Sequence, residues 1–481
     1  MGAFILNIKG GLLMRTDTIA AIATAVSDSG IGIIRISGED AIKVADSIYR
    51  SKTNKKRLTN VKSHTIHYGF IYDEEELIDE VMVAVMKAPN SYTCEDTVEI
   101  DCHGGILMVN KILETVLKNG CRLAEPGEFT KRAFLNGRID LSKAEAVMDI
   151  IHSKNEFALK SSVKQLKGAV SDKIGKLRDD ILYEIAFIES ALDDPEHISL
   201  EGYNQKLENK ASEISAQIKK LIDSADNGKM LKDGINTVIV GKPNAGKSSL
   251  LNVLVGEDKA IVTSVAGTTR DVLEENIKLH GVGLNIIDTA GIRDTNDEVE
   301  KIGVEKARKY AGNADLIIYV VDASKPLDEN DEDIIRLICD KKIIVLLNKT
   351  DLEQVVSEEI ITDKFNQMSE IYDGDEIRVI KTSTKENTGI DEFENTIKDM
   401  FFDGEIAIND EIYITNQRHK EALALAYESM NMVLASLADD MPEDFYSIDL
   451  MSAYAALGRI IGQEVEDDLV NEIFGKFCMG K

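Results

Sequence analysis

Residues from Gly241 to Ser248 read Gly-Lys-Pro-Asn-Ala-Gly-Lys-Ser, which is the spacing of a phosphate-binding loop. An apolar run ending at Val240 precedes them and a helical pattern from Ser249 follows, and such a loop requires this strand and helix context. The glycines let backbone N–H groups face phosphates, and the helix N-terminus adds partial positive charge. We therefore expect Lys247 to contact the β and γ phosphates and the hydroxyl of Ser248 to bind Mg²⁺.

Three further motifs follow apolar runs. Asp288-Thr289-Ala290-Gly291 would place a carboxylate toward the magnesium ion and a glycine beside the γ phosphate. Asn348-Lys349-Thr350-Asp351 ends in a carboxylate that could accept hydrogen bonds from the imino and amino groups of guanine, a donor pair that adenine lacks. Ser383-Thr384-Lys385 supplies the last loop expected to contact the base. Four motifs in this order, each at the end of a strand, predict a GTP-binding domain.

The residues expected to take part in GTP hydrolysis differ from those of Ras-like proteins. In Ras-like proteins a glutamine after the glycine of the third motif orients the attacking water, whereas Ile292 occupies that position here. Another group must therefore position the water, and the acidic candidates are Asp294, Asp297, Glu298 and Glu300. Taken alone, any one of these carboxylates is more often a solvated surface charge than a catalytic group. The segment Thr263-Ser264-Val265-Ala266-Gly267-Thr268-Thr269-Arg270-Asp271 offers hydroxyl and carbonyl oxygens for cations.

The elements that must position these residues follow from the apolar patterns. Apolar runs alternate with amphipathic helices over residues 234–402, which predicts a mostly parallel sheet covered by helices on both faces. Residues 1–138 mix strand-like runs with short helices and predict a compact α+β domain. Residues 139–233 and 403–481 have helical patterns. The simplest arrangement is one helical domain into which the α/β domain is inserted.

One stripe of apolar residues predicts a long helix in the first helical zone. Its members recur every three or four positions: Leu166, Val170, Ile174, Leu177, Ile181, Ile185, Ile188 and Leu192. The sequence Asp193-Asp194-Pro195 is expected to end this helix. We interpret the stripe as part of a bundle core, because it is too short to favour a free coiled coil.

The composition excludes several classes of protein. With 43% hydrophobic and 29% charged residues, the 481-residue chain is globular rather than disordered. No segment approaches the ~20 apolar residues of a membrane span. The five cysteines form no CxxC pair, which argues against a disulfide framework or a zinc ribbon and favours a reducing, cytoplasmic compartment. The first residues lack the features of a signal peptide, and Met1 and Met14 are equally good candidates for the natural start.

The net charge of −29 excludes a global field that would draw the chain onto phosphate backbones. A nucleic-acid partner would have to meet a local basic surface. Two clusters of basic residues are candidates, and the default interpretation of each is a solvated surface charge. One cluster consists of Lys160, Lys164, Lys167, Lys173, Lys176 and Arg178, and the other of Lys52, Lys55, Lys56, Arg57 and Lys62.

Four segments together give the chain a family resemblance that extends from about Asp17 to the C-terminus. These are the phosphate loop, the run from Ala266 to Asp271, the run Pro126-Gly127-Glu128-Phe129-Thr130-Lys131-Arg132-Ala133-Phe134-Leu135-Asn136-Gly137, and the terminal Phe477-Cys478-Met479-Gly480-Lys481. The chain resembles the tRNA modification GTPase family MnmE, also called TrmE. The resemblance implies an N-terminal tetrahydrofolate-binding and dimerisation domain (1–138), a helical domain (139–233 and 403–481) and an inserted Ras-like G domain (234–402).

The resemblance also implies the reaction. Proteins of this family work with the flavoprotein MnmG to add an aminomethyl or carboxymethylaminomethyl group to the 5-carbon of the wobble uridine in certain tRNAs. They use a one-carbon unit from 5-formyl- or 5,10-methylene-tetrahydrofolate. GTP hydrolysis accompanies that chemistry and is activated by potassium-stimulated dimerisation of G domains, without an arginine finger.

Carried over residue by residue, the resemblance assigns the metal ligands, the group that orients the attacking water and the residues that contact GTP. Magnesium would be held by Ser248 and Thr269, and potassium by Asn244, Thr268 and the carbonyls of Thr263 and Val265. Glu300 would orient the attacking water through a bridging water. The remaining GTP contacts would come from Ala245, Gly246, Ser249, Ser264, Ala266 and Gly267 together with the motifs above.

Folate contacts would come from Arg35, Glu99, Arg138 and Lys481. A carboxylate suits the donor edge of a pterin, and a terminal lysine suits the carboxylates of the cofactor. Cys478 is ambiguous from the sequence: near Lys481 it could act as a nucleophile, or it could be packed in the helical bundle.

Two other functions remain open on the sequence alone. One is a nucleotide switch that binds ribosomal RNA or assembly factors without modification chemistry, and the other is a folate-dependent aminomethyltransferase. The sequence shows neither which tRNAs are substrates nor whether ammonium or glycine supplies the nitrogen.

Overall fold

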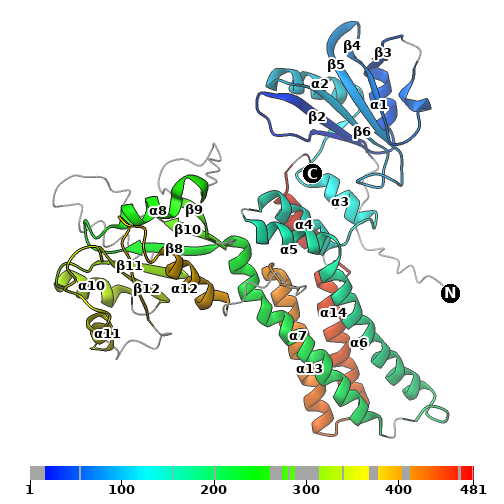
Figure 1. The fold of residues 1–481 in the computed structure, drawn as a ribbon. Coiled ribbons are helices and arrows are strands. Elements are labelled where there is room, and N and C mark those ends of the chain that lie inside the picture. The colour runs from blue at the N-terminus through cyan, green and yellow to red at the C-terminus, as the bar shows by residue number, and fades with distance from the viewer. Residues whose placement is uncertain are drawn as a thin grey trace. The chain divides into compact units, whose positions relative to one another are not determined.

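A computed structural model describes residues 17–53, 56–153, 155–199, 202–259, 274–279, 282–287, 312, 314–338, 341–367, 377–402, 412–463, 467–478 and 480 (Figure 1). The chain forms two compact units, residues 1–151, 164–215 and 425–481, and residues 152–163 and 216–424. Among the described helices, none combines the length and apolar character needed to cross a bilayer.

The first unit contains a seven-stranded sheet in the order β3-β4-β5-β6-β2-β1-β7. The strands are β1 (Ile19–Ile22), β2 (Ser29–Ser37), β3 (Tyr49–Ser51), β4 (Thr65–Asp73), β5 (Glu76–Met86), β6 (Thr97–Gly104) and β7 (Arg122–Leu123). All neighbours are antiparallel except β1 and β7. Helices α1 (Ala41–Ile48) and α2 (Ile106–Lys118) share one apolar core with one face of this sheet. The predicted α+β architecture of the N-terminal part is confirmed.

The strands alternate as a half-covered sheet requires. In β2, Ile34 and Ile36 are fully buried in the core with the helices, while Arg35 between them belongs to the opposite face. Gly32 is in close contact with α2, since a Cβ atom there would lie 2.4 Å from the side chain of Val109. The face that carries Arg35 is called the open face below.

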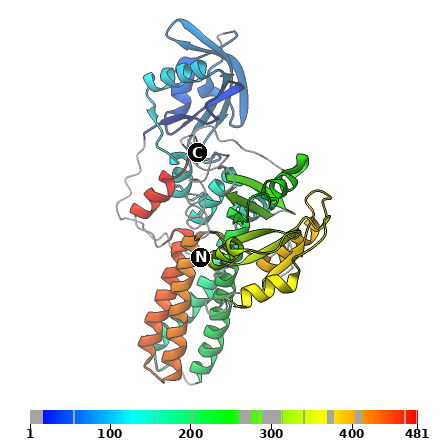
Figure 2. The ribbon, with the colours of Figure 1, turned by 90° about the vertical axis from the view of Figure 1, so that its left-hand side faces the viewer.

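The rest of the first unit is helical. Its helices are η1 (Leu58–Asn60), α3 (Glu128–Leu135), α4 (Leu141–His152), α6 (Ala169–Asp193), α14 (Glu443–Ile461) and α15 (Asp467–Gly475), and α5 (Glu156–Leu166), α7 (Tyr203–Asp233) and α13 (Gln417–Ala438) contribute residues to both units. In Figures 1 and 2, α6 and α14 run side by side with the parts of α7 and α13 that belong to this unit. The predicted bundle is confirmed.

The long apolar stripe is divided between two helices, which corrects one prediction. α6 begins only at Ala169, after Gly168, whose φ of +109° ends the preceding helix. Leu166 therefore belongs to α5 and is exposed, and Leu192 is exposed near the end of α6. The six stripe residues between them are buried, and α6 ends at Asp193 as expected.

The predicted basic cluster on α6 also needs a correction. The guanidinium of Arg178 lies 3.9 Å from the ring centroid of Tyr454 and donates a hydrogen bond to Gln463. Arg178 is only 4% exposed, so it belongs to the bundle and not to a basic surface. Arg178 lies next to the buried apolar stripe. A count of charges along the sequence does not reveal whether a residue at such a position faces the core or the solvent.

The second unit contains a six-stranded sheet in the order β13-β12-β11-β8-β10-β9. Its strands are β8 (Ile235–Val240), β9 (Glu274–Leu279), β10 (Val282–Ile287), β11 (Leu316–Asp322), β12 (Ile343–Asn348) and β13 (Arg378–Lys381), and all pairs are parallel except β9 with β10. Helices α8 (Lys247–Lys259) and α12 (Ile390–Phe402) pack in one core cluster, and α10 (Glu329–Ile338) and α11 (Glu358–Gln367) in another. The mostly parallel sheet with two covered faces is confirmed.

Candidate functional site

The phosphate loop connects β8 to α8 and is closely packed at both ends. A Cβ atom on Gly241, whose φ is +148°, would lie 2.3 Å from the carbonyl oxygen of Val320 in β11. A Cβ atom on Gly246, whose φ is +109°, would lie 2.0 Å from the side-chain nitrogen of Asn348. Both positions require glycine, because the left-handed backbone and the close neighbour leave no room for a side chain.

The ammonium of Lys247 lies against the backbone of the same loop. Its Nζ donates hydrogen bonds to the carbonyl oxygens of Gly241, at 2.7 Å, and Lys242, at 2.8 Å. Ser248 and Ser249 are exposed in the first turn of α8, and Asn244 is exposed with a φ of +61°. This is the arrangement of backbone amides, lysine and hydroxyl by which a phosphate loop holds a triphosphate.

The motifs expected to contact the base are joined to the phosphate loop by side-chain hydrogen bonds. Nδ2 of Asn348 donates to the carbonyl oxygen of Ala245 at 2.9 Å, and its Oδ1 accepts from the backbone N–H of Thr384 at 3.2 Å. The hydroxyl of Ser383 donates to Oδ1 of Asp351 at 2.8 Å. The structure thus brings the phosphate loop and the Asn348 and Ser383 motifs to one edge of the sheet.

Asp322, the last residue of β11, is a functional candidate that the motif search missed. Its Oδ2 accepts a hydrogen bond of 2.6 Å from Nζ of Lys349, whose φ is +67°. Burial alone would raise the pKa of Asp322, but the hydrogen bonds from Lys349 and Ser324 outweigh it and lower the pKa. Its position at the carboxyl end of a strand could have identified it. Lys385 completes this edge, 3.8 Å from Asp351.

Several predicted residues lie outside the described part of the chain. These are Thr263, Ser264, Val265, Ala266, Gly267, Thr268, Thr269, Asp288, Thr289, Ala290, Gly291, Glu300 and Lys481. The magnesium and potassium ligands among them and the water-orienting glutamate remain predictions.

The predicted folate ligands in the first unit converge from different elements. Arg35 in β2 pairs in register with Glu99 in β6, and Nε of Arg35 donates to Oε1 of Glu99 at 2.8 Å. The guanidinium of Arg35 lies 5.5 Å from the ring centroid of Tyr92, and that of Arg138 lies 4.8 Å from the same ring. Two cations and a carboxylate therefore gather at one aromatic side chain, which the sequence did not single out.

The C-terminal segment contacts the N-terminal domain at two glycines. The backbone N–H of Gly127 donates to the carbonyl oxygen of Cys478 at 3.2 Å, and a Cβ atom on Gly127 would lie 2.4 Å from the carbonyl oxygen of Phe474. A Cβ atom on Gly480 would lie 2.5 Å from the carbonyl oxygen of Ile22. Glycine at both positions allows the tail to pack directly on backbone.

Cys478 itself is exposed, which removes the interpretation that it is packed in the bundle. His103 lies in β6, and its Nδ1 is 2.7 Å from Oδ1 of Asp79. Among the residues that the structure describes, no group of histidine, cysteine or acidic side chains could hold a metal ion.

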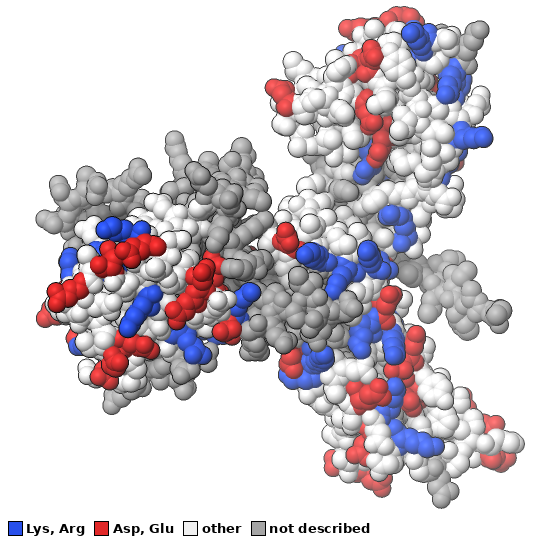
Figure 3. Space-filling view, viewed as in Figure 1, with Lys and Arg blue, Asp and Glu red and all other residues white. Residues whose placement is uncertain are grey.

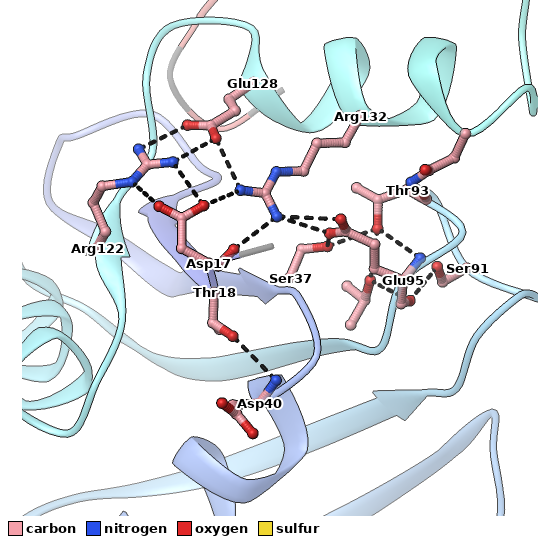
Figure 4. A network of polar contacts seen from close by, with 12 residues as sticks. Asp17, Thr18, Ser37, Asp40, Ser91, Thr93, Glu95, Arg122, Glu128 and Arg132 are labelled. Carbon is pink, nitrogen blue, oxygen red and sulfur yellow. Dashed lines mark hydrogen bonds and ion pairs between the residues drawn. The ribbon is translucent and has the colours of Figure 1, made fainter. Parts of the chain in front are cut away.

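Two arginines and three carboxylates form a network next to this site (Figure 4). Arg122 contacts Asp17 and Glu128, each at 2.6 Å. Arg132 contacts Asp17 at 3.0 Å, Glu128 at 3.0 Å and Glu95 at 3.1 Å. The hydrogen bond from Arg122 lowers the pKa of Asp17. Burial would raise the pKa of Glu128, but its hydrogen bonds to both arginines and to a backbone N–H lower it, so both carboxylates are charged at neutral pH.

This network fixes the loop that carries Tyr92. Glu95 lies in the same loop, and its ion pair with Arg132 ties the loop to α3. The hydroxyl of Tyr92 lies 2.9 Å from that of Thr130 in α3. The side chain of Asn136, at the end of α3, donates to the carbonyl oxygen of Thr93 at 2.6 Å. The ring of Tyr92, which lies near Arg35 and Arg138, is therefore on a loop that hydrogen bonds and an ion pair attach to α3.

The architecture and the phosphate and base motifs define a multidomain P-loop GTPase. Its residues 18–138 match the family model "GTP-binding protein TrmE N-terminus", and residues 141–478 match the model "MnmE helical domain". Two relatives are the tRNA modification GTPases MnmE of Lachnoclostridium phytofermentans, 58% identical over 97% of this chain and 100% of the relative, and of Clostridioides difficile, 50% identical over 97% and 99%. Era of Aquifex aeolicus, a solved structure, is 28% identical over 41% of this chain and 67% of its own, at a TM-score of 0.26, which is too low to support a conclusion.

The chain belongs to the tRNA modification GTPase family MnmE. The resemblance drawn from the four sequence segments is confirmed, and with it the GTPase activity and the role in tRNA modification. The alternative of a nucleotide switch without modification chemistry is wrong for a member of this family.

Proposed function

We propose that the chain is a potassium-activated GTPase that works with the flavoprotein MnmG in the cytoplasm. Together they would install aminomethyl or carboxymethylaminomethyl groups at the 5-carbon of wobble uridine in tRNA, with a tetrahydrofolate one-carbon unit. The observation that carries the folate part is the convergence of Arg35, Glu99 and Arg138 at Tyr92, beside the C-terminal tail.

The chemistry of these residues suits a folate. A carboxylate such as Glu99 can accept hydrogen bonds from the donor edge of a pterin, and guanidinium groups bind carboxylates in charge-assisted pairs. Arg35 already pairs with Glu99 at 2.7 Å, so the two charges hold each other in place before a ligand arrives. Lys481 follows Gly480 directly and would add a further cation at the carboxylate end of the ligand. The bound folate would supply the one-carbon unit, and Cys478, exposed in the same tail, is a candidate nucleophile.

In the G domain, Lys247 would stabilise the charge that develops on the phosphates, and Ser248 and Thr269 would hold Mg²⁺. We assign K⁺ to Asn244, Thr263, Val265 and Thr268, where a monovalent cation could supply the charge that an arginine finger supplies elsewhere. Glu300 would orient the attacking water.

A homodimer through the open face of the N-terminal sheet is supported by exposed apolar side chains. Along one row across the strands, Tyr68 in β4 pairs with Met82 in β5, and the next row joins Ile66 to Ala84. Ile66 is 65% exposed and Tyr68 and Met82 are each 47% exposed. The second row continues to Glu99 and Arg35, so a second copy on this face would border the folate residues. Such a cluster on a sheet surface favours contact with another protein surface.

We assign tRNA contact to the MnmG partner together with the lysines on and before α6. In Figure 3, Lys and Arg side chains gather around α4 and the start of α6. The lysines on and before α6 are Lys160, Lys164, Lys167, Lys173 and Lys176. On most of the remaining face shown, acidic and basic side chains are interspersed.

Mass spectrometry of wobble nucleosides tests the proposed function. Cells that lack the chain should lose the modified uridines, and the wild-type gene should restore them. The Lys247→Ala and Arg35→Met variants should each fail to restore them, because one removes phosphate binding and the other removes a folate contact. Normal modification with Arg35→Met would contradict the folate assignment, and normal modification in the cells without the chain would contradict the function.

A further inference from the structure

Lys242, the second residue of the phosphate loop, is anchored to helix α10 through an ion-pair cluster. Its Nζ lies 2.6 Å from Oδ2 of Asp331 and 2.9 Å from Oδ2 of Asp328. The side chain of Asp331 is 2% exposed and that of Lys242 is 21% exposed. The motif pattern allows almost any residue at this position, so the anchor is a property of this chain rather than of the loop.

The two aspartates form a capping box at the start of α10. Oδ1 of Asp328 accepts hydrogen bonds from the backbone N–H groups of Asn330, at 3.0 Å, and Asp331, at 3.3 Å. Oδ2 of Asp331 accepts in return from the backbone N–H of Asp328 at 2.9 Å. This reciprocal arrangement satisfies the first N–H groups of the helix and fixes both carboxylates relative to its axis.

A buried tyrosine attaches the same cluster to the central sheet. The hydroxyl of Tyr319, a fully buried residue of β11, donates to Oδ1 of Asp331 at 2.8 Å. Asp331 therefore has hydrogen bonds from Tyr319, from the Asp328 backbone and from Lys242. Burial alone would lower the pKa of Lys242, but the two carboxylates outweigh it and raise the pKa, so the ammonium of Lys242 is charged at neutral pH.

The anchored residue also holds the catalytic lysine. The carbonyl oxygen of Lys242 accepts a hydrogen bond from Nζ of Lys247 at 2.8 Å. A displacement of Lys242 would therefore displace a hydrogen-bond acceptor of the residue that reaches the phosphates. On the other side, Gly241 packs against Val320, so the start of the loop is fixed by β11 and by α10 together.

We propose that Lys242 and Asp331 are positioning residues for nucleotide binding, which act by holding the first half of the phosphate loop and the ammonium of Lys247 in the geometry that a triphosphate requires. Neither residue touches the nucleotide in this account. Because Lys247 contacts the phosphates both before and during hydrolysis, loss of the anchor weakens binding more than it slows the chemical step.

The test measures the affinity of the full chain for a fluorescent GTP analogue with Mg²⁺, together with single-turnover hydrolysis and the melting temperature. Lys242→Met should weaken nucleotide binding by about tenfold and change the hydrolysis rate by less than about threefold. Asp331→Asn should act in the same direction, and the double variant should be no weaker than Lys242→Met alone, because both changes remove one interaction. Lys242→Arg should retain most of the wild-type affinity for the nucleotide, because a guanidinium can pair with both carboxylates.

Lys364→Met is the matched control. Nζ of Lys364 in α11 lies 2.5 Å from Oε1 of Glu332 in α10, the helix that also carries Asp331, and this ion pair joins two helices rather than a helix to the phosphate loop. The control should leave nucleotide affinity within about twofold of the wild type. The proposal is overturned if Lys242→Met and Lys364→Met have equal affinities. It is also overturned if the losses from Lys242→Met and Asp331→Asn multiply in the double variant, or if Lys242→Met lowers the melting temperature without weakening binding.

Discussion

Arg35 donates a hydrogen bond of 3.0 Å from Nη1 to the backbone carbonyl oxygen of Gly480, a residue 445 positions later in the chain. The same guanidinium pairs with Glu99, so one side chain links the open face of the N-terminal sheet to the C-terminal tail. Two segments far apart in the sequence, β2 and the C-terminal tail, therefore meet at Arg35. Any ligand that engages Arg35 would also meet the tail.

Gly480→Ala should separate the tail from the N-terminal domain. The added Cβ atom would lie 2.5 Å from the carbonyl oxygen of Ile22 and 2.6 Å from Cα of Ala23. Both are backbone atoms, so the clash can be relieved only if the tail or the strand moves. We expect affinity for 5-formyl-tetrahydrofolate, measured by equilibrium dialysis, to fall about tenfold or more while GTP hydrolysis is unchanged. Gly475→Ala is the control, because a Cβ atom there meets nothing within 4 Å. Equal folate affinity in the two variants would show that docking of the tail does not matter.

Family resemblance proposed residues for this site, whereas the contacts that hold those residues in place were not predicted. Arg35, Glu99 and Arg138 were assigned to folate binding by family resemblance, and the structure brings the three side chains together near Tyr92, while the folate role stays a prediction. Tyr92 and the partners of Arg132 were not predicted, because contacts between residues far apart in sequence leave no local periodicity. The division at Gly168 was missed for a related reason: the apolar stripe continues across the break, and a single glycine within a helical pattern is a weak signal.

Glu128→Gln should reduce the pH dependence of stability. The folded state lowers the pKa of Glu128 and of Asp17, so their ion pairs stabilise the fold above the pKa values of the unfolded chain. This stability is lost as the pH falls from the pKa values of the unfolded chain through the lower pKa values of the folded state. In urea titrations of the full chain, the variant should lose about 1–3 kcal/mol at pH 7 and less at pH 3.5. Glu114→Gln, on the exposed side of α2, should show neither loss, and an equal loss from Glu128→Gln at both pH values would contradict the account.

Asn348→Ala should uncouple the base-binding motifs from the phosphate loop. The substitution removes the donor to the carbonyl oxygen of Ala245 and the acceptor for the N–H of Thr384, both in a residue that is 1% exposed. We expect GTP affinity to fall at least tenfold and the unfolding free energy to fall by about 1–3 kcal/mol. Fluorescence titration with a GTP analogue checks the first effect and urea denaturation the second. Retained affinity would show that the two loops are positioned independently.

Asn244→Ala tests the proposed potassium ligand. Replacement of sodium by potassium should raise the hydrolysis rate of the wild-type chain, and the variant should hydrolyse GTP at one rate in both salts. Rates measured at equal ionic strength exclude a general effect of salt. A wild-type rate that is indifferent to the cation would remove the potassium assignment.

The meeting of the phosphate loop with the Asn348 and Ser383 motifs was predictable from sequence, because each of these three lies at the end of a strand and the parallel sheet brings the strand ends together. Asp322 and the anchor of Lys242 were not predicted. A single aspartate or lysine is too common to stand out, and only the fold reveals that Tyr319, Asp331 and Lys242 meet. Close approaches such as that of Gly246 to Asn348 explain why the motif glycines are needed, which the spacing alone does not.

Calorimetric titration of the full chain with 5-formyl-tetrahydrofolate, for the wild type and for Arg35→Met, tests the central claim most directly. We expect one binding site per chain in the wild type. We expect affinity at least about a hundredfold lower in the variant, because Arg35 would supply a cation to the ligand and it contacts both Glu99 and the tail. No heat of binding in the wild type, or equal binding in the two proteins, would contradict the claim that this convergence of residues is a folate site.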